Sequence, residues 1–162
     1  MELETWLAPP GEVIPNNARF EVLVYRGLPL DDPRGRFAGH GWGGTWVSNV
    51  FDFHHFHSTS HEALAVLSGN ATIELGGPQG QAFEVAAGDV LVLPAGTGHR
   101  RARDADGFRV MGAYPAGQED YDLLREADDA ARVRIAALGA PPDDPVGGEG
   151  VARWRAAEGE SS

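Results

Sequence analysis

The feature that most constrains the fold of this 162-residue chain is a succession of short strand-like segments between residues 44 and 114. TWVSNVFDF is followed by HEALAVLSG, ATIELGG, QAFEVAAGD, VLVLPAG and FRVMGAY, with glycine-rich turns between them. Such segments recur about every 8–12 residues, a spacing typical of a small β-sandwich or β-barrel. We therefore predict one all-β domain over residues 1–162, with a barrel core at about 20–115.

The segments on either side of this core differ from it. Residues 1–19 are expected to form an N-terminal arm, followed by a strand in FEVLVY and a short helix that begins at Asp32-Pro33. Residues 116–162 are expected to form a helical tail, because EDYDLLREADDAARVRIAAL has helical spacing. Its first acidic residues would form a solvated first turn. One aromatic residue of the tail, Trp154, would pack against the rest of the domain.

Composition excludes several kinds of chemistry. The chain has no cysteine, so thiolate ligands, thiol nucleophiles and disulfides are excluded. All 13 basic residues are arginine, which excludes a Schiff-base lysine and a P-loop lysine. The net charge of −11 disfavours nucleic acid and anionic membrane surfaces as partners. With neither a signal peptide nor a long apolar run in the sequence, we expect a cytoplasmic protein.

Four of the six histidines lie in FDFHHFHSTSHE, residues 51–62. In a strand, His55 and His57 would point to the same face, where two imidazoles can bind one metal ion. Glu62, near the start of the next strand, could supply a third ligand. A fourth must come from His40 or His99, and His99 is the better candidate because it follows a buried strand and a rigid Pro-Ala-Gly turn.

The two remaining histidines of this segment have other expected roles. His54 points away from the face of His55 and is expected to support a ligand ring from behind. His61 competes with Glu62 for one place and is a candidate for ligand or substrate contact. The alternative for the whole cluster is an exposed polar strand or a pH-sensitive patch.

Two motifs in this region resemble those of the cupin family. The first, G(X)5HXH(X)3–4E(X)6G, matches His55, His57, Glu62 and Gly69, although Asn49 replaces its leading glycine. The second, G(X)5PXG(X)2H(X)3N, matches Gly88, Pro94, Gly96 and His99, although Arg103 replaces its closing asparagine. HGWGGTW, HSTSHE, LPAGTGH and GAYPAGQ further resemble the YjlB-type single-domain cupins, and this resemblance includes the tail.

The resemblance implies an RmlC-like jelly-roll β-barrel that forms a homodimer. It also implies one divalent transition metal, held by His55, His57, Glu62 and His99. Three imidazoles and one carboxylate suit Fe, Mn, Ni, Co, Cu or Zn. About eight strands would leave room for one small ligand inside such a barrel.

Three further side chains could line a pocket beside this metal site. Arg103 could hold a substrate carboxylate through its guanidinium group, although surface pairing with neighbouring aspartates is the alternative. Tyr114 could supply a hydroxyl group. Trp46, like Trp42, is expected to pack in the core or at a dimer interface rather than to line the pocket.

These features favour a metal-dependent enzyme of oxygenase or isomerase type. Its substrate would be a small oxygen-rich or carboxylate-bearing metabolite. A cupin that binds or senses a small ligand without turnover is one alternative. The other is a metal-free, epimerase-like cupin with acid and base residues, for which four convergent ligand-type side chains would be unnecessary.

Overall fold

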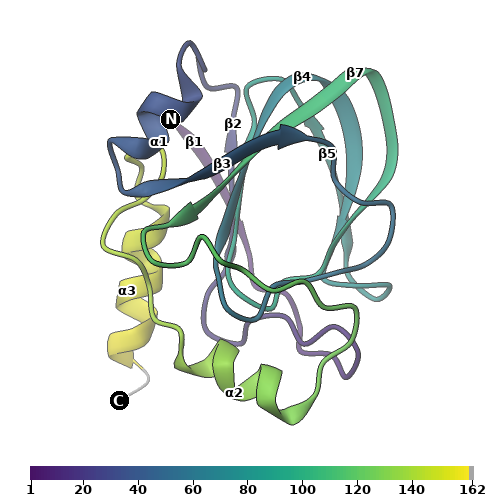
Figure 1. Cartoon of the computed structure of the whole chain (residues 1–162), viewed down its shortest axis with the longest axis vertical. Helices are drawn as coiled ribbons and strands as arrows, with labels where there is room; N and C mark the ends of the chain where they lie inside the picture. Colours follow the sequence, from purple (N-terminus) through teal and green to yellow (C-terminus); the bar gives the residue numbers. More distant parts are fainter. Residues whose placement is uncertain (161–162) are drawn as a thin grey trace.

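The computed structural model describes residues 1–160, which form one antiparallel seven-stranded sheet and three helices (Figure 1). The strands are β1 (Glu2–Trp6), β2 (Val22–Arg26), β3 (Trp42–Ser48), β4 (Glu62–Leu75), β5 (Gln81–Ala86), β6 (Val90–Leu93) and β7 (His99–Pro115). The helices are α1 (Pro33–Ala38), α2 (Asp129–Ala137) and α3 (Gly150–Glu160). None of the helices in this part of the chain is long and apolar enough to cross a membrane.

The sheet is organised around the long strand β4. Its strand order is β1-β2-β6-β4-β7-β3, and β5 pairs with the distal half of β4. Because β4 pairs with β7 along one edge and with β6 and then β5 along the other, the sheet curls around an interior (Figure 1). The predicted all-β jelly-roll class is confirmed, although β1 and β3 remain the two ends of this order and do not close a barrel.

Side chains alternate between the two faces of this sheet within each regular stretch, and the irregular pairing around Gly69 shifts the alternation of β4 by one residue. Leu64 and Val66 of β4 belong to the cluster on what we call the inner face, whereas Ala63 and Ala65 belong to the cluster on the outer face. The period of two in a strand explains this division. The other strands follow it, with inner residues Val22, Val24, Leu91, Leu93, Phe108 and Val110 and outer residues Leu23, Tyr25, Val90, Val92, Met111 and Ala113.

Helices and large aromatic side chains fill the outer face. Trp154 of α3 is buried and stacks on Phe20, with the ring centroids 5.2 Å apart, so the tail docks through this residue as expected. Trp42 is also buried, and its Nε1 donates a hydrogen bond to the backbone oxygen of Asp143 at 2.9 Å. The short helix α1 begins at Pro33, as the sequence predicts, and the Asp32 side chain caps it.

The strands differ from the predicted segments in three places. β3 ends at Ser48, so the chain carrying His55 and His57 is not a continuous strand. The two segments expected at 61–69 and 71–77 form the single strand β4, which passes through irregular pairing around Gly69. The N-terminal arm contains a strand, because β1 pairs with β2 along its whole length.

The predicted helix over 119–138 is wrong for its first half. Only Asp129–Ala137 is helical, and Asp128 caps this helix by accepting a hydrogen bond from Ala131 N at 2.8 Å. The preceding residues lie at the surface, where Leu124 forms an isolated β-bridge with Phe56. Backbone pairing with the barrel therefore replaces helical hydrogen bonds in this segment.

Candidate metal centre

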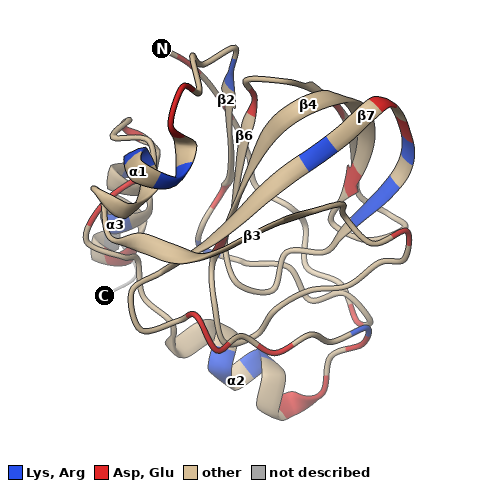
Figure 2. Ribbon diagram, turned by 45° about the horizontal axis from the view of Figure 1, so that its top comes forward, with Lys and Arg blue, Asp and Glu red and all other residues tan. Residues whose placement is uncertain are grey.

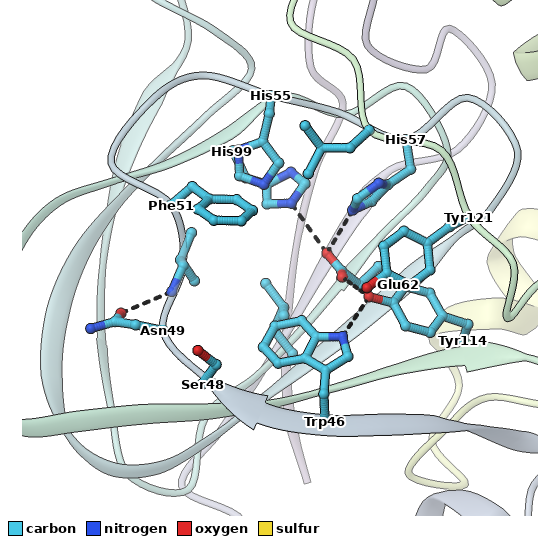
Figure 3. Close-up of a pocket in the computed structure, with 13 residues that line it drawn as sticks. Trp46, Ser48, Asn49, Phe51, His55, His57, Glu62, His99, Tyr114 and Tyr121 are labelled. Carbon is cyan, nitrogen blue, oxygen red and sulfur yellow. Dashed lines mark hydrogen bonds and ion pairs between the residues drawn. The ribbon is translucent and has the colours of Figure 1, made fainter.

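Three buried histidines converge at one end of the inner face. His55 and His57 come from the connection between β3 and β4, and His99 begins β7. One ring nitrogen of each lies within 4.8 Å of those of the other two. His55 and His99 exchange backbone hydrogen bonds at 3.2 and 2.9 Å, which brings their ring centroids to 4.0 Å (Figure 3).

The Pro94-Ala95-Gly96 turn holds this arrangement in place. Gly96 N donates to the backbone oxygen of His57 at 2.7 Å, and the turn leads directly to His99. Gly96 has a φ of +91°, and a Cβ there would lie 2.6 Å from the backbone oxygen of Asn16. Only glycine fits this turn, which explains its place in the second motif.

Backbone carbonyl groups fix the orientation of all three imidazoles. His55 Nδ1 lies 2.9 Å from Phe53 O, His99 Nδ1 lies 3.0 Å from Thr97 O, and His57 Nδ1 contacts Asp122 O. A carbonyl oxygen can only accept, so each Nδ1 is the donor. In a neutral ring the lone pair is then on Nε2, the form in which histidine binds metal ions.

Glu62 completes the group from the start of β4. Its Oε1 lies 3.1 Å from His99 Nε2 and 3.5 Å from His57 Nε2, and its Oε2 accepts a hydrogen bond from the Tyr114 hydroxyl group at 2.6 Å (Figure 3). A carboxylate oxygen and an imidazole lone pair are both acceptors. At these distances they require a cation between them, which is either a proton or a metal ion.

Burial and mutual attraction shift the pKa values of this group. Burial lowers the pKa of His55 to about 3, and repulsion by His99 adds to the effect. Burial opposes ionisation of His57 and Glu62, yet their attraction raises the pKa of His57 and holds that of Glu62 well below its usual range. Burial and Glu62 raise the pKa of Tyr114, which keeps its phenolic proton. The result is a buried pair of negatively charged Glu62 and proton-binding His57 beside neutral His55, and a bound metal ion would replace that proton.

Three imidazoles and a carboxylate in this arrangement fit a divalent transition metal. One nitrogen of each histidine lies in a common region, Glu62 Oε1 lies against two of these histidines, His57 and His99, and Tyr114 donates to the other Glu62 oxygen. A charged carboxylate needs a counter-charge when it is buried, and a divalent ion would provide it. The structure therefore brings His55, His57 and His99 together with Glu62 beside two of them, and metal binding by these four residues stays a prediction.

A cavity of about 220 Å³ opens beside these four residues. Tyr114 lines it, as expected, and so does Trp46, whose Nε1 donates to the Tyr114 hydroxyl group at 2.7 Å. Trp42 packs in the outer-face core as expected, but Trp46 contributes to the pocket wall instead. The irregular pairing of β3 between Gly43 and Trp46 accounts for this difference, because residues four apart in a regular strand would face the same side.

His61 lies on the outer face and does not reach the cavity. Its Nδ1 accepts from Ala95 N at 2.9 Å, and its Nε2 is 2.8 Å from Gly139 O, so both ring nitrogens have protein partners. Burial lowers its pKa to about 4. The expected contact between His61 and a ligand is not supported, because neighbouring residues of a strand face opposite sides and Glu62 occupies the inner one.

Two other predicted residues also lie apart from the cavity. His54 faces Glu74, with its Nε2 3.9 Å from Glu74 Oε2, rather than supporting a ligand ring. Arg103 donates to Glu84 Oε2 at 2.9 Å and to Thr72 Oγ1 at 3.2 Å on the exposed part of β7, which carries both basic and acidic residues (Figure 2). The predicted role of Arg103 in binding a carboxylate therefore has no structural support.

The tail contributes residues that the sequence analysis did not identify. Tyr121 and Leu123 line the cavity, and Tyr121 stacks on Tyr114 at 4.1 Å between ring centroids. Asp122 lies between them and anchors the segment, since its carboxylate accepts from Ser58 N at 2.7 Å and from Thr59 N at 3.2 Å. The helical spacing of this segment predicted a helix, so no sequence pattern indicated that Tyr121 and Leu123 line the cavity or that Asp122 anchors them.

Comparison with known proteins agrees with the motifs. Residues 47–110 match the model of the Cupin domain. The chain is 36% identical over 155 residues to the uncharacterised protein YjlB of Bacillus subtilis, covering 91% of this chain and 92% of YjlB.

This chain belongs to the cupin family.

Solved structures with similar folds are more distant from this cupin. A DUF861-family protein of Thermotoga maritima shares 18% identity, with 57% of this chain and 97% of that protein covered and a TM-score of 0.40. Acireductone dioxygenase of Bacillus anthracis, with a cadmium ion in its active centre, shares 19% identity, with 54% and 59% covered and a TM-score of 0.40. A variant of Bacillus subtilis oxalate decarboxylase shares 18% identity, with 65% and 27% covered and a TM-score of 0.39.

Proposed function

We propose that this cupin binds one divalent transition metal through His55, His57, His99 and Glu62 and acts as a metal-dependent enzyme on a small molecule. The observation that carries the proposal is the approach of Glu62 Oε1 to two histidine Nε2 atoms whose Nδ1 atoms are already committed to carbonyl groups. A proton can satisfy one such contact, whereas a metal ion satisfies all of them together.

The chain's own residues orient the site. Tyr114 donates to Glu62 Oε2 and so leaves Oε1 directed at the histidines. The backbone oxygen of Asp122 holds His57 through its Nδ1. A bound divalent ion would supply Lewis-acid polarisation of an oxygen atom of the substrate.

The substrate would bind in the adjacent cavity through its oxygen atoms. An oxygenase or an isomerase reaction on a small oxygen-rich metabolite is consistent with this geometry. A carboxylate-bearing substrate was expected partly because of Arg103, which lies elsewhere. We also propose that the cupin is a cytoplasmic homodimer that does not bind nucleic acid or membranes, in keeping with its net charge of −11.

Oxygen consumption by the metal-loaded cupin tests the reaction type. Incubation with candidate small hydroxy and keto compounds, monitored with an oxygen electrode and by mass spectrometry, distinguishes the two reactions. Substrate-dependent uptake with a product of increased mass indicates an oxygenase, and a product of unchanged mass without uptake indicates an isomerase. A metal-loaded cupin that retains a ligand unchanged would instead be a binding module, and catalysis would be contradicted.

A further inference from the structure

The cavity beside the four candidate ligands has aromatic and aliphatic walls. Phe51 lies on one side, the stacked rings of Tyr114 and Tyr121 lie on the other, and Trp46 lies opposite the histidines (Figure 3). Aliphatic side chains fill the spaces between the rings, namely Val50, Leu64 and Leu123. Flat apolar surfaces on several sides favour a flat apolar ligand, because both dispersion contacts and burial of apolar area then increase.

Among the residues that the structure describes, no arginine lines this cavity, and the chain has no lysine. Four arginines come from neighbouring segments, and each is engaged elsewhere. Arg101 donates to Val50 O and Asp104, Arg100 to Asp52 O and Glu74, and Arg103 to Glu84. Arg125 lies over the Phe53 ring, 4.2 Å from its centroid. A carboxylate or phosphate group in the cavity would have no cationic side chain to pair with.

Charge further limits what the site accepts. Glu62 is buried, and a carboxylate that ligates a metal ion is deprotonated, so a divalent ion held there would leave one net positive charge. One anionic oxygen neutralises that charge, whereas a second anionic group would be buried without a partner. Ser48 and Asn49 provide only neutral polar groups at the cavity wall.

We propose that the ligand of this site is a small planar molecule, the size of a single ring, that carries one acidic hydroxyl group beside a second oxygen. It is a phenol or enol with at most one negative charge, and not a dicarboxylate or a phosphate ester. This assignment rests on the proposed metal function and specifies its substrate class. A volume of about 220 Å³ suits a ligand of this size.

Two probes that each chelate a metal ion through two oxygens test this class. Tropolone is a planar monoanion with a seven-membered ring, and malonate is a dianion without a ring. Both are titrated calorimetrically into the zinc-loaded cupin at low ionic strength. We expect tropolone to bind at least about tenfold more tightly, equivalent to about 1.4 kcal/mol. Equal affinities, or tighter binding of malonate, would overturn the proposal.

A pair of matched variants tests whether the cavity wall causes the preference for tropolone over malonate. Phe51→Arg introduces a cation at a residue that lines the cavity, and Val47→Arg introduces one on β3 outside it. The two positions are 51% and 52% exposed, so both should tolerate the change. We expect the preference for tropolone to fall at least about tenfold in Phe51→Arg and to persist in Val47→Arg. An unchanged preference in Phe51→Arg contradicts the proposal.

Metal content, measured on the same samples before and after titration, distinguishes a failure of the proposed metal function from a failure of the proposed ligand class. A cupin that takes up no zinc contradicts the metal function and the ligand class together. A cupin that retains zinc and prefers malonate contradicts the ligand class alone.

Discussion

The two faces of the sheet place buried histidines in different environments. On the outer face, His61 packs against Phe20 and Trp154, and protein groups satisfy both of its ring nitrogens. On the inner face, His57 and His99 each have one nitrogen bound to a carbonyl group, while the other faces Glu62. All three rings are buried. Burial therefore does not mark a candidate ligand, whereas an uncommitted Nε2 does.

The boundary between these two environments lies at one peptide bond. His61 and Glu62 are neighbours, and the alternation of β4 sends them to opposite faces. The outer face is filled by helices and tryptophans, while the inner face keeps a cavity beside the histidines. The following predictions test this division, beginning with the largest expected effect.

Replacement of His99 by alanine should remove most of the bound metal and leave the fold intact. Loss of residues that merely support a ligand weakens metal binding 10–100-fold, so loss of a ligand should exceed about 100-fold. Elemental mass spectrometry gives the metal content, and circular dichroism gives the fold. A His99→Ala protein that still carries one metal ion per chain would show that the ligand assignment is wrong.

The His61→Ala substitution should have the opposite effect. It removes two hydrogen bonds and a ring packed against Trp154, so we expect the free energy of unfolding to fall by about 2–4 kcal/mol. Metal content should stay at one per chain in the folded fraction. Urea unfolding and elemental analysis measure the two quantities. Loss of metal from stable His61→Ala protein would contradict the claim that His61, on the outer face, has no part in metal binding.

Asp122→Asn tests whether the tail supports the metal centre. Asp122 anchors the segment that holds His57, so we expect metal affinity to fall roughly tenfold. Asp144→Asn is the matched control, because Asp144 forms a similar junction with Tyr25, Val146 and Gly148 on the outer face. It should lower stability by about 1–2 kcal/mol without changing metal affinity. Competition titration with a chromophoric chelator measures the affinities, and equal values for the two variants would contradict this role.

Acid should destabilise the outer face through His61. Its pKa falls from 6.5 to about 4 on folding, so between these pH values the unfolded chain binds more protons. Stability should therefore decrease as pH falls from 6.5 towards 4, by at most about 1.4 kcal/mol per pH unit from this residue. Above pH 6.5 it contributes no pH dependence. Comparison of urea midpoints with those of His61→Gln isolates the effect, and parallel profiles would refute it.

Arg103→Ala should have the smallest effect. Arg103 pairs with Glu84 on the surface and does not line the cavity, so metal content and tropolone affinity should match those of the unaltered protein. The same calorimetric titration measures it. A tenfold or larger loss of tropolone affinity would show that Arg103 contributes to ligand binding.

The parts of the candidate site that were predictable from sequence depend on backbone periodicity and turn chemistry. Alternation placed His55 and His57 together, and the Pro-Ala-Gly turn identified His99, because both rules act over a few residues. Glu62 was also identified, while His61 was left open, since the start of β4 decides which of the two faces inward.

The remaining parts depend on contacts between distant segments. Residues 119–128 have helical spacing, but the Asp122 carboxylate accepts hydrogen bonds from Ser58 N and Thr59 N, and these contacts hold the segment in a non-helical conformation. Tyr121 and Leu123 reach the cavity only for that reason. Trp46 lines it because the pairing of β3 with β7 is irregular between Gly43 and Trp46. Arg103 pairs with Glu84 of β5, which lies beyond Thr72 of the intervening strand β4. No local pattern encodes these relationships.

The most direct test of the central claim is the metal content of the cupin, purified without an affinity tag or added metal and measured by elemental mass spectrometry. We predict close to one equivalent of a divalent transition metal per chain, whichever of the candidate ions it is. Protein that contains no metal, and takes none up on reconstitution with iron, manganese, nickel, cobalt, copper or zinc, would contradict the account.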